Sequence, residues 1–192
     1  MPPKAKFTKQ QITEAALDII RQKGMENLTA RALGKRLGSS ACPVFTAFEN
    51  MEEVQSAVRK AAKDLYGEYV KRGLEETPAF KGVGMQYILF AIREPKLFQL
   101  LFMSEQPQKP GVANVLPVIE ENYPEILRSV QNSHDLQESN AEKLYRHLWI
   151  YTHGIAVLCA TNMCTFTPEE MGRMLTEVCT SILNEIKGGR AE

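Results

Sequence analysis

Helix-start signals recur along this chain, and each one precedes apolar residues spaced for a helix. Thr8 and Gln11 have the spacing of a capping box, in which the threonine hydroxyl accepts an amide N–H of the first turn. Similar cap spacings occur at residues 50–53 and 167–170. No segment shows the clean alternation of a half-buried strand. The sequence therefore predicts an all-α fold.

The composition places the chain among globular proteins. It has 192 residues, of which 44% are hydrophobic and 24% charged, and no run of about 18 apolar residues that would span a bilayer. Residues 1–9 carry lysines and prolines with no apolar stretch after them, so no secretory signal is expected. The four cysteines stand singly, which favours reduced thiols in a cytoplasmic protein over a disulfide or zinc framework.

A neutral net charge conceals an asymmetry between the two ends. Residues 1–48 hold eight basic and three acidic side chains, and the excess of acids lies in the remainder. A basic end is a reason to expect a polyanionic partner such as DNA, and the alternative is that 48 residues hold this excess of charge by chance.

Two short helical segments, residues 29–37 and 41–48, are joined at Gly38. Thr29 has the position of an N-cap, and glycine can supply a positive φ between the segments. This is the spacing of a helix-turn-helix, whose second helix enters the DNA major groove. The sequence predicts a three-helix DNA-binding domain with a basic arm over residues 1–50. It predicts a larger helical domain for ligand binding and dimerisation over residues 51–192. The first helix of this second domain, about 51–72, is expected to connect the two domains. The small apolar core of the first domain is expected to contain Leu17, Ile20, Leu28, Leu33, Leu37, Val44 and Phe48.

Several motifs stand in register between residues 12 and 58. They are Ala15-Ala16-Leu17 with Gly24, Leu28-Thr29-Ala30-Arg31-Ala32-Leu33, Leu37-Gly38-Ser39-Ser40, Val44-Phe45 with Phe48, and Asn50-Met51-Glu52. Together they resemble the N-terminal DNA-binding domain of TetR-type transcriptional regulators. Near the other end, Trp149 to Gly154 resembles the Trp-x-x-x-His-Gly signature of one class of TetR-type C-terminal domains. The resemblance implies a homodimeric regulator, with a repressor released by a small effector as the leading interpretation.

DNA contacts are expected on the arm, at the start of the second helix and around the turn. In the family, the position of Arg31 reaches a phosphate or a base edge. Basic and short polar side chains suit phosphate and base contacts, although Thr29 and Ser40 are equally suited to capping helices. The predicted set is Lys4, Lys6, Lys9, Thr29, Arg31, Ser39, Ser40, Ala41 and Thr46.

The predicted recognition helix departs from the family pattern. Phe45 replaces the tyrosine that is usual in the family, and Ala47 replaces a frequent histidine. Met51 stands at the position of a common lysine, and Ala41 at a position where a basic or long polar residue is frequent. Segment 41–48 therefore has no charged side chain, and Thr46 is its one clear polar side chain for contact with bases. DNA binding then depends on Arg31 and the arm, or the chain is a helical adaptor or sensor that has lost DNA binding.

The last two predicted helices have the pattern of a dimer interface. Residues 144–160 are apolar nearly all round, and the final helix carries an apolar stripe, so two copies are expected to form a four-helix interface around a two-fold axis. A purely intramolecular core is the alternative. The predicted interface residues are Leu158, Met171, Met174, Leu175, Val178, Ile182 and Ile186.

Methionines and aromatic residues of the middle and late helices favour a pocket for a small apolar or amphipathic effector. Each of them has ordinary core packing as its alternative, and His153 in particular is suited to a hydrogen bond inside the core. The predicted lining is Met85, Phe90, Phe98, Phe102, Met103, Trp149, His153 and Met163.

Other functional classes receive little support from the residues. Cys159 and His153 diverge on one helix, no third orienting group is evident, and the three histidines lack metal-ligand spacing, so no enzyme, cofactor or metal is predicted. A thiol redox-responsive regulator stays an alternative, with Cys42 near a helix N-terminus as its candidate.

Overall fold

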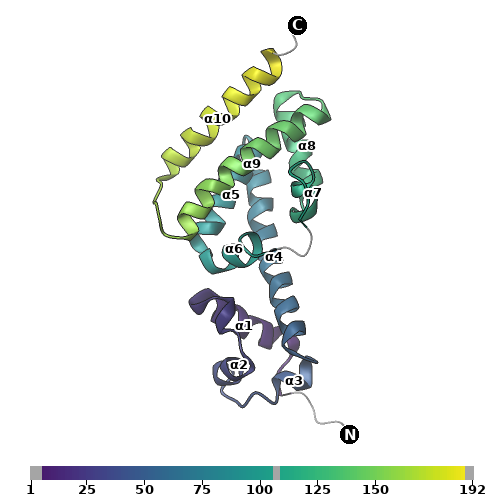
Figure 1. Ribbon diagram of the computed structural model, residues 1–192, viewed down its shortest axis with the longest axis vertical. Helices are drawn as coiled ribbons and strands as arrows, with labels where there is room; N and C mark the ends of the chain where they lie inside the picture. The colour runs from purple at the N-terminus through teal and green to yellow at the C-terminus, as the bar shows by residue number, and fades with distance from the viewer. Residues whose placement is uncertain (1–5, 106–108, 189–192) are drawn as a thin grey trace. The chain divides into compact units, whose positions relative to one another are not determined.

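The computed structural model describes residues 6–105 and 109–188 and shows a helical protein (Figure 1). No strand occurs in these two ranges, and the all-α prediction is confirmed. Within the same ranges no helix is long and apolar enough to cross a membrane. The elements are α1 (Lys9–Lys23), η1 (Met25–Asn27, a 3₁₀ turn), α2 (Ala30–Arg36), α3 (Val44–Ala47), α4 (Met51–Glu75), α5 (Ala79–Arg93), α6 (Pro95–Phe102), α7 (Val115–Ile119), α8 (Tyr123–His134), α9 (Glu138–Ala160) and α10 (Pro168–Gly188).

These elements form two compact units. Unit 1 comprises residues 1–65 and 94–104, and unit 2 comprises residues 66–93 and 105–192. The long helix α4 belongs to unit 1 up to Leu65 and to unit 2 from Tyr66. Packing thus divides the chain within α4, whereas the sequence predicts a functional boundary at residue 50, which stays a prediction. The reason for the difference is that one uninterrupted helix can contribute its two ends to two cores.

The predicted cap residues begin their helices. Thr8 Oγ1 accepts the backbone N–H of Gln11 at 3.1 Å, and the Gln11 side chain accepts the N–H of Thr8 at 2.9 Å. Asn50 accepts the N–H of Glu53 at 2.8 Å at the start of α4. The capping box of residues 167–170 is likewise complete at α10. These caps satisfy N–H groups that have no partner within the helix.

The core of unit 1 lies between α1, α2, α3 and the start of α4, with α6 packed on α1. Five of the seven predicted core residues are buried, and only Leu17 and Leu37 are half-buried. Gly34 of α2 is buried against the turn that follows, because a Cβ placed on it would come within 2.7 Å of the Ser40 backbone. A side chain at position 34 would therefore push the turn away from α2.

Unit 2 is built around α9, which packs against α5, α8 and α10. α4 and α5 cross closely where a Cβ on Gly82 would lie 2.3 Å from the carbonyl oxygen of Gly73. This close approach leaves α5 in position to place one face toward α9 and α10, where the cavity described below is found.

Candidate functional site

The helix-turn-helix of unit 1 has the predicted turn but a shorter second helix. Gly38 adopts a φ of 64°, and the Ser39 N–H donates to the Gly34 carbonyl at 2.8 Å. Residues 41–43 form a turn, and α3 begins only at Val44, so the predicted helix over 41–48 is wrong at its start. The physical reason is that Pro43 has no N–H and the next N–H groups close tighter i→i−3 bonds, such as Phe45 to the Cys42 carbonyl.

Most of the predicted DNA-contacting side chains in the described ranges are exposed. Arg31, Ser40 and Thr46 are exposed, and Lys6 Nζ donates to Ser39 Oγ at 3.3 Å, which brings the arm to the turn. Thr29 is exposed at the start of α2 and accepts the Ala32 N–H at 3.1 Å, so it does cap this helix.

Two lysines of the arm, Lys9 and Lys4, were predicted to contact DNA. Lys9 pairs with Glu53 and lies 5.0 Å from the centroid of the Phe48 ring, so its charge is already engaged. Hydrogen bonds from Lys9 and from the Glu49 backbone lower the pKa of Glu53. Lys4 lies outside the described residues, and Ala41 is half-buried in the turn.

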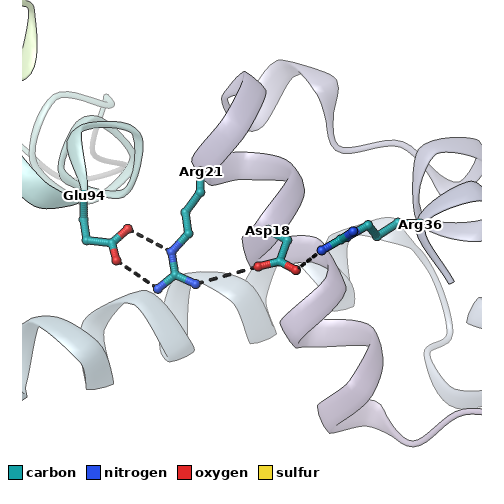
Figure 2. Close-up of polar contacts among 4 residues, drawn as sticks. All are labelled: Asp18, Arg21, Arg36 and Glu94. Atoms are coloured by element: carbon teal, nitrogen blue, oxygen red, sulfur yellow. Dashed lines mark hydrogen bonds and ion pairs between the residues drawn. The ribbon is translucent and has the colours of Figure 1, made fainter.

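A chain of charged residues joins α2 to α6 across α1 (Figure 2). Arg36 of α2 pairs with Asp18 of α1, and Asp18 also lies 3.9 Å from Arg21 Nη1. Arg21 in turn forms two hydrogen bonds with Glu94, the residue before α6. All four residues belong to unit 1, so this chain ties the helix-turn-helix to the segment that directly follows α5 in the sequence.

Unit 2 contains a cavity of about 200 Å³ bounded by α4, α5, α8, α9, α10 and the segment after α7. Five aromatic residues stand on its wall among aliphatic and small polar ones: Tyr66, Phe80, Tyr87, Tyr145 and Trp149. Several of these rings meet edge to face, with centroids 5.9 Å apart for Tyr66 and Tyr87 and 5.6 Å apart for Phe80 and Tyr145. Such a lining is typical of sites for small, mainly apolar ligands.

One buried carboxylate interrupts this aromatic wall. Glu120 is 6% exposed, and its Oε2 accepts the Tyr66 hydroxyl at 2.6 Å. Its Oε1 accepts the backbone N–H of Asn122 at 3.0 Å and the side-chain amide of Asn122 at 3.1 Å. Burial, followed by the negative charge of Glu120, raises the pKa of Tyr66, Tyr87 and Tyr145 well above its ordinary value. These tyrosines are therefore protonated hydrogen-bond donors at neutral pH.

Further polar residues of the wall lie on α5, α8, α9 and α10. Lys81 is exposed and donates to Thr176 Oγ1 at 3.0 Å. Cys179 Sγ lies 4.0 Å from His134 Nε2. Burial, then the charge of Lys187, lowers the pKa of His134, and burial raises the pKa of the Cys179 thiol, so both groups are neutral near pH 7.

Of the predicted ligand-binding residues, only Trp149 lies on the cavity wall. Three of them fall in unit 1, because α6 packs there: Phe98 is buried in its core, Phe102 is half-buried and Met103 exposed. Phe90 is fully buried, and Met85 lies on a part of α5 that does not line the cavity. Met163 is 75% exposed after α9. The expected lining is thus corrected, since residue type alone did not separate cavity wall from core.

His153 lies behind the wall instead of on it. Its Nδ1 is 2.9 Å from the Tyr87 hydroxyl, and its ring stacks on Trp149 with centroids 5.3 Å apart. Burial lowers the pKa of His153, so the ring is neutral near pH 7 and shares one hydrogen bond with the Tyr87 hydroxyl through Nδ1. His153 therefore orients two wall residues from the second layer, and the core hydrogen bond weighed from the sequence is the one observed.

The predicted dimer residues divide between two faces. Met171, Leu175 and Ile186 are buried within the single chain, and Leu175 lines the cavity. The half-buried residues Met174, Val178 and Ile182 follow one another at intervals of four on α10, and Leu158 of α9 is also half-buried. The half-buried group still has solvent-exposed apolar surface in a single chain, whereas the buried group does not. Only the half-buried group is therefore available for contact with a partner chain.

Comparison with known proteins identifies the family to which this chain belongs. Residues 80–182, more than half of the chain, match the family model described as the C-terminal domain of tetracyclin repressor-like proteins. The chain belongs to the tetracyclin repressor-like family. It is thus a transcription regulator, and the prediction that it is not an enzyme agrees with this family.

A solved structure has the same fold as this tetracyclin repressor-like protein. A transcriptional regulator from Rhodococcus sp. Rha1 superposes with a TM-score of 0.62 at 18% identity, covering 92% of this chain and 96% of that one. A search of curated protein sequences found no significant match. The more specific Trp-x-x-x-His-Gly resemblance stays a prediction.

Sequence reasoning missed several residues of the regulator's cavity. Glu120 looked like one of many surface acids, and its position between the short helices α7 and α8 gave no sign of burial. Tyr66 was not singled out among the residues of the connecting helix. A tyrosine on the buried face of a helix does need a hydrogen-bond partner, and this requirement was the available signal that an acceptor lies inside unit 2.

Proposed function

We propose that this regulator is a repressor that binds a palindromic operator as a homodimer and is released by a small effector held in the unit 2 cavity. The observation that carries the proposal is the continuity of α4. One uninterrupted helix begins beside the helix-turn-helix and supplies Tyr66 to the cavity wall. A ligand that shifts Tyr66 therefore acts on a helix that also contributes residues to the DNA-binding unit.

On the DNA side, α2, the turn and α3 form the reading surface. Arg31 and Lys6 supply charge for phosphates, and the exposed Thr46 supplies a hydroxyl. Phe45, exposed on α3, replaces a hydrogen-bonding tyrosine with a ring that suits contact with a thymine methyl group. This composition favours A·T-containing half-sites.

On the dimer side, α9 and α10 supply an apolar face. It combines Met174, Val178 and Ile182 with Leu158 and with Ile150, which is 48% exposed. In a two-fold dimer of this kind, the two reading surfaces would meet half-sites in successive major grooves, about 34–36 Å apart. An effector that prefers a different separation lowers DNA affinity, and moving such an equilibrium from 1:99 to 99:1 needs about 5.5 kcal/mol of differential affinity. A regulator of this kind acts in the cytoplasm, where its DNA lies.

The test is fluorescence anisotropy of the full chain with its own upstream intergenic DNA and with a scrambled duplex, across a salt series. We expect tight binding to the upstream DNA only. Arg31→Ala is expected to weaken it by about tenfold and to reduce the salt slope by about 1, as for a lost phosphate contact. Arg128→Ala, which removes the same charge from an exposed position of α8, is the matched control and should bind like the wild type.

Equal and salt-fragile binding to both duplexes, or none, would contradict this assignment. The uncharged recognition segment would then favour the second candidate, a helical sensor that has lost DNA binding.

A further inference from the structure

The unit 2 cavity buries a carboxylate, Glu120, that forms no ion pair with a basic side chain in residues 6–105 and 109–188. All hydrogen-bond donors to the Glu120 carboxylate in the described part of the chain are neutral: the Tyr66 hydroxyl, and the backbone N–H and side-chain amide of Asn122. Buried charges in proteins are ordinarily paired, because desolvation of a carboxylate costs several kcal/mol. A carboxylate on a cavity wall without an ion-pair partner can thus be paired by the positive charge of a ligand in the cavity.

The rest of the wall suits a cation as well. Tyr66, Tyr87, Tyr145 and Trp149 surround the same space as Glu120, and the faces of such rings attract cations. The influence of Glu120 on the pKa of all three tyrosines indicates that its field extends across the cavity. His134 is neutral, so Lys81 is the single positive group on the wall, and it is exposed and bonded to Thr176. The interior is therefore anionic.

The size of the cavity limits the ligand. A cavity of about 150 Å³ lined by aliphatic and aromatic residues holds one benzene molecule. The 200 Å³ here leaves space for one ring and a short substituent.

We propose that the effector of this cavity is a small monocyclic aromatic amine or an apolar amine of similar size, bound with its ammonium group at Glu120 and its ring among the tyrosines. This rests on the proposed role of the cavity as the effector site. It adds the charge and size of the ligand, which neither the family nor the fold specifies.

The chain contains a built-in reporter for the test, since its one tryptophan is Trp149 on the cavity wall. Trp149 fluorescence of the DNA-free protein is titrated with three probes of similar shape: 2-phenylethylamine, 2-phenylethanol and 3-phenylpropanoate. We expect saturable binding with the amine tightest and the carboxylate weakest. The preference for amine over alcohol should be about tenfold or more, as for a hydrogen bond to a charged group.

Glu120→Gln should abolish this preference while leaving the affinity for the alcohol unchanged. Glu121→Gln, the same change at the exposed neighbouring residue, is the matched control and should keep it. The wild-type probe order stands alone as a test should Glu120→Gln not fold. No saturable amine binding, equal binding of amine and carboxylate, or an unchanged preference in Glu120→Gln overturns the proposal.

A second titration of the same probes, into the operator complex and followed by anisotropy, distinguishes this inference from the proposed function. Amine binding that leaves the anisotropy of the operator complex unchanged would contradict the effector role and support the ligand class. Effector-dependent DNA release by a ligand of another charge, without amine binding, would support the repressor and contradict the ligand class.

Discussion

Arg21 and Glu94 form a two-pronged ion pair in which Arg21 Nε donates to Oε2 at 2.8 Å and Nη2 donates to Oε1 at 3.0 Å. Glu94 is 17% exposed and directly precedes α6, while Arg21 lies on α1 and continues through Asp18 to Arg36 of α2 (Figure 2). The helix-turn-helix is thereby linked to Glu94, directly before α6, by ion pairs as well as by the packing of α6 on α1.

Glu94→Gln is expected to reduce the free energy of unfolding by about 1–2 kcal/mol, because a bidentate, charge-assisted pair loses one charge in a partly buried place. Urea denaturation monitored by circular dichroism measures this. Asp64→Asn makes the same change in the exposed Lys60–Asp64 pair of the same unit and is expected to cost less than about 0.5 kcal/mol. Equal costs in the two variants would contradict a special role of the Arg21–Glu94 pair.

Gly34→Ala tests the close approach of α2 to the turn. The new Cβ would meet the Ser40 backbone at 2.7 Å, so the turn must move, at a cost of about 1–3 kcal/mol, and DNA affinity should fall with it. Gly67→Ala on α4 is the control, because nothing lies within 4 Å of its Cβ and alanine should stabilise the helix by about 0.5–1 kcal/mol. Thermal melting and operator anisotropy of both variants give the answer. A Gly34→Ala protein as stable as the Gly67→Ala protein would be incompatible with the packing described.

Val178→Glu tests the dimer face of α10. A carboxylate in the centre of a half-buried apolar stripe would be desolvated without a partner in the assembly, so we expect monomers. Asn184→Glu adds the same charge at an exposed position of the same helix and should leave the dimer intact. Sedimentation velocity distinguishes the two states. Wild-type sedimentation of the Val178→Glu protein would remove this stripe from the interface.

Acid should destabilise the protein through His153 and His134. Burial lowers the pKa of both from the ordinary 6.5, so the unfolded chain takes up protons at a higher pH than the folded one. The free energy of unfolding therefore decreases as the pH falls from 7.5 to 5.5, above the range in which the carboxylates titrate. His153→Gln should flatten this dependence, whereas His147→Gln, at an exposed site, should retain it in full. Parallel profiles of wild type and His153→Gln in urea denaturation would count against the buried, neutral histidine.

The helices and their ends could be predicted from the sequence because their determinants are local. Thr8 reaches Gln11 and Thr167 reaches Glu170 within one turn, so the cap residues are recognisable without knowledge of the fold. The same locality explains the error at residues 41–43. A proline such as Pro43 is compatible with a first helical turn, yet here the turn tightens and the helix begins after it.

The cavity residues were largely missed because an apolar helix face does not reveal what it meets. Phe90 and Tyr87 both lie on α5 and are both buried, yet only Tyr87 borders the cavity. On α10, the stripe that includes Leu175 and Val178 is wide enough to serve two partners, and only packing shows that Leu175 faces α5 and α9.

The sequence by itself determined an all-helical fold with a capped helix-turn-helix, since caps, glycine turns and apolar periodicity act within a few residues. The tertiary structure alone decided that Glu120 meets Tyr66, 54 residues away, and that Arg21 meets Glu94, 73 residues away. Pairings of this kind depend on which helices pack together. That choice minimises exposed apolar area and unpaired polar groups over the whole chain, so no local pattern contains it.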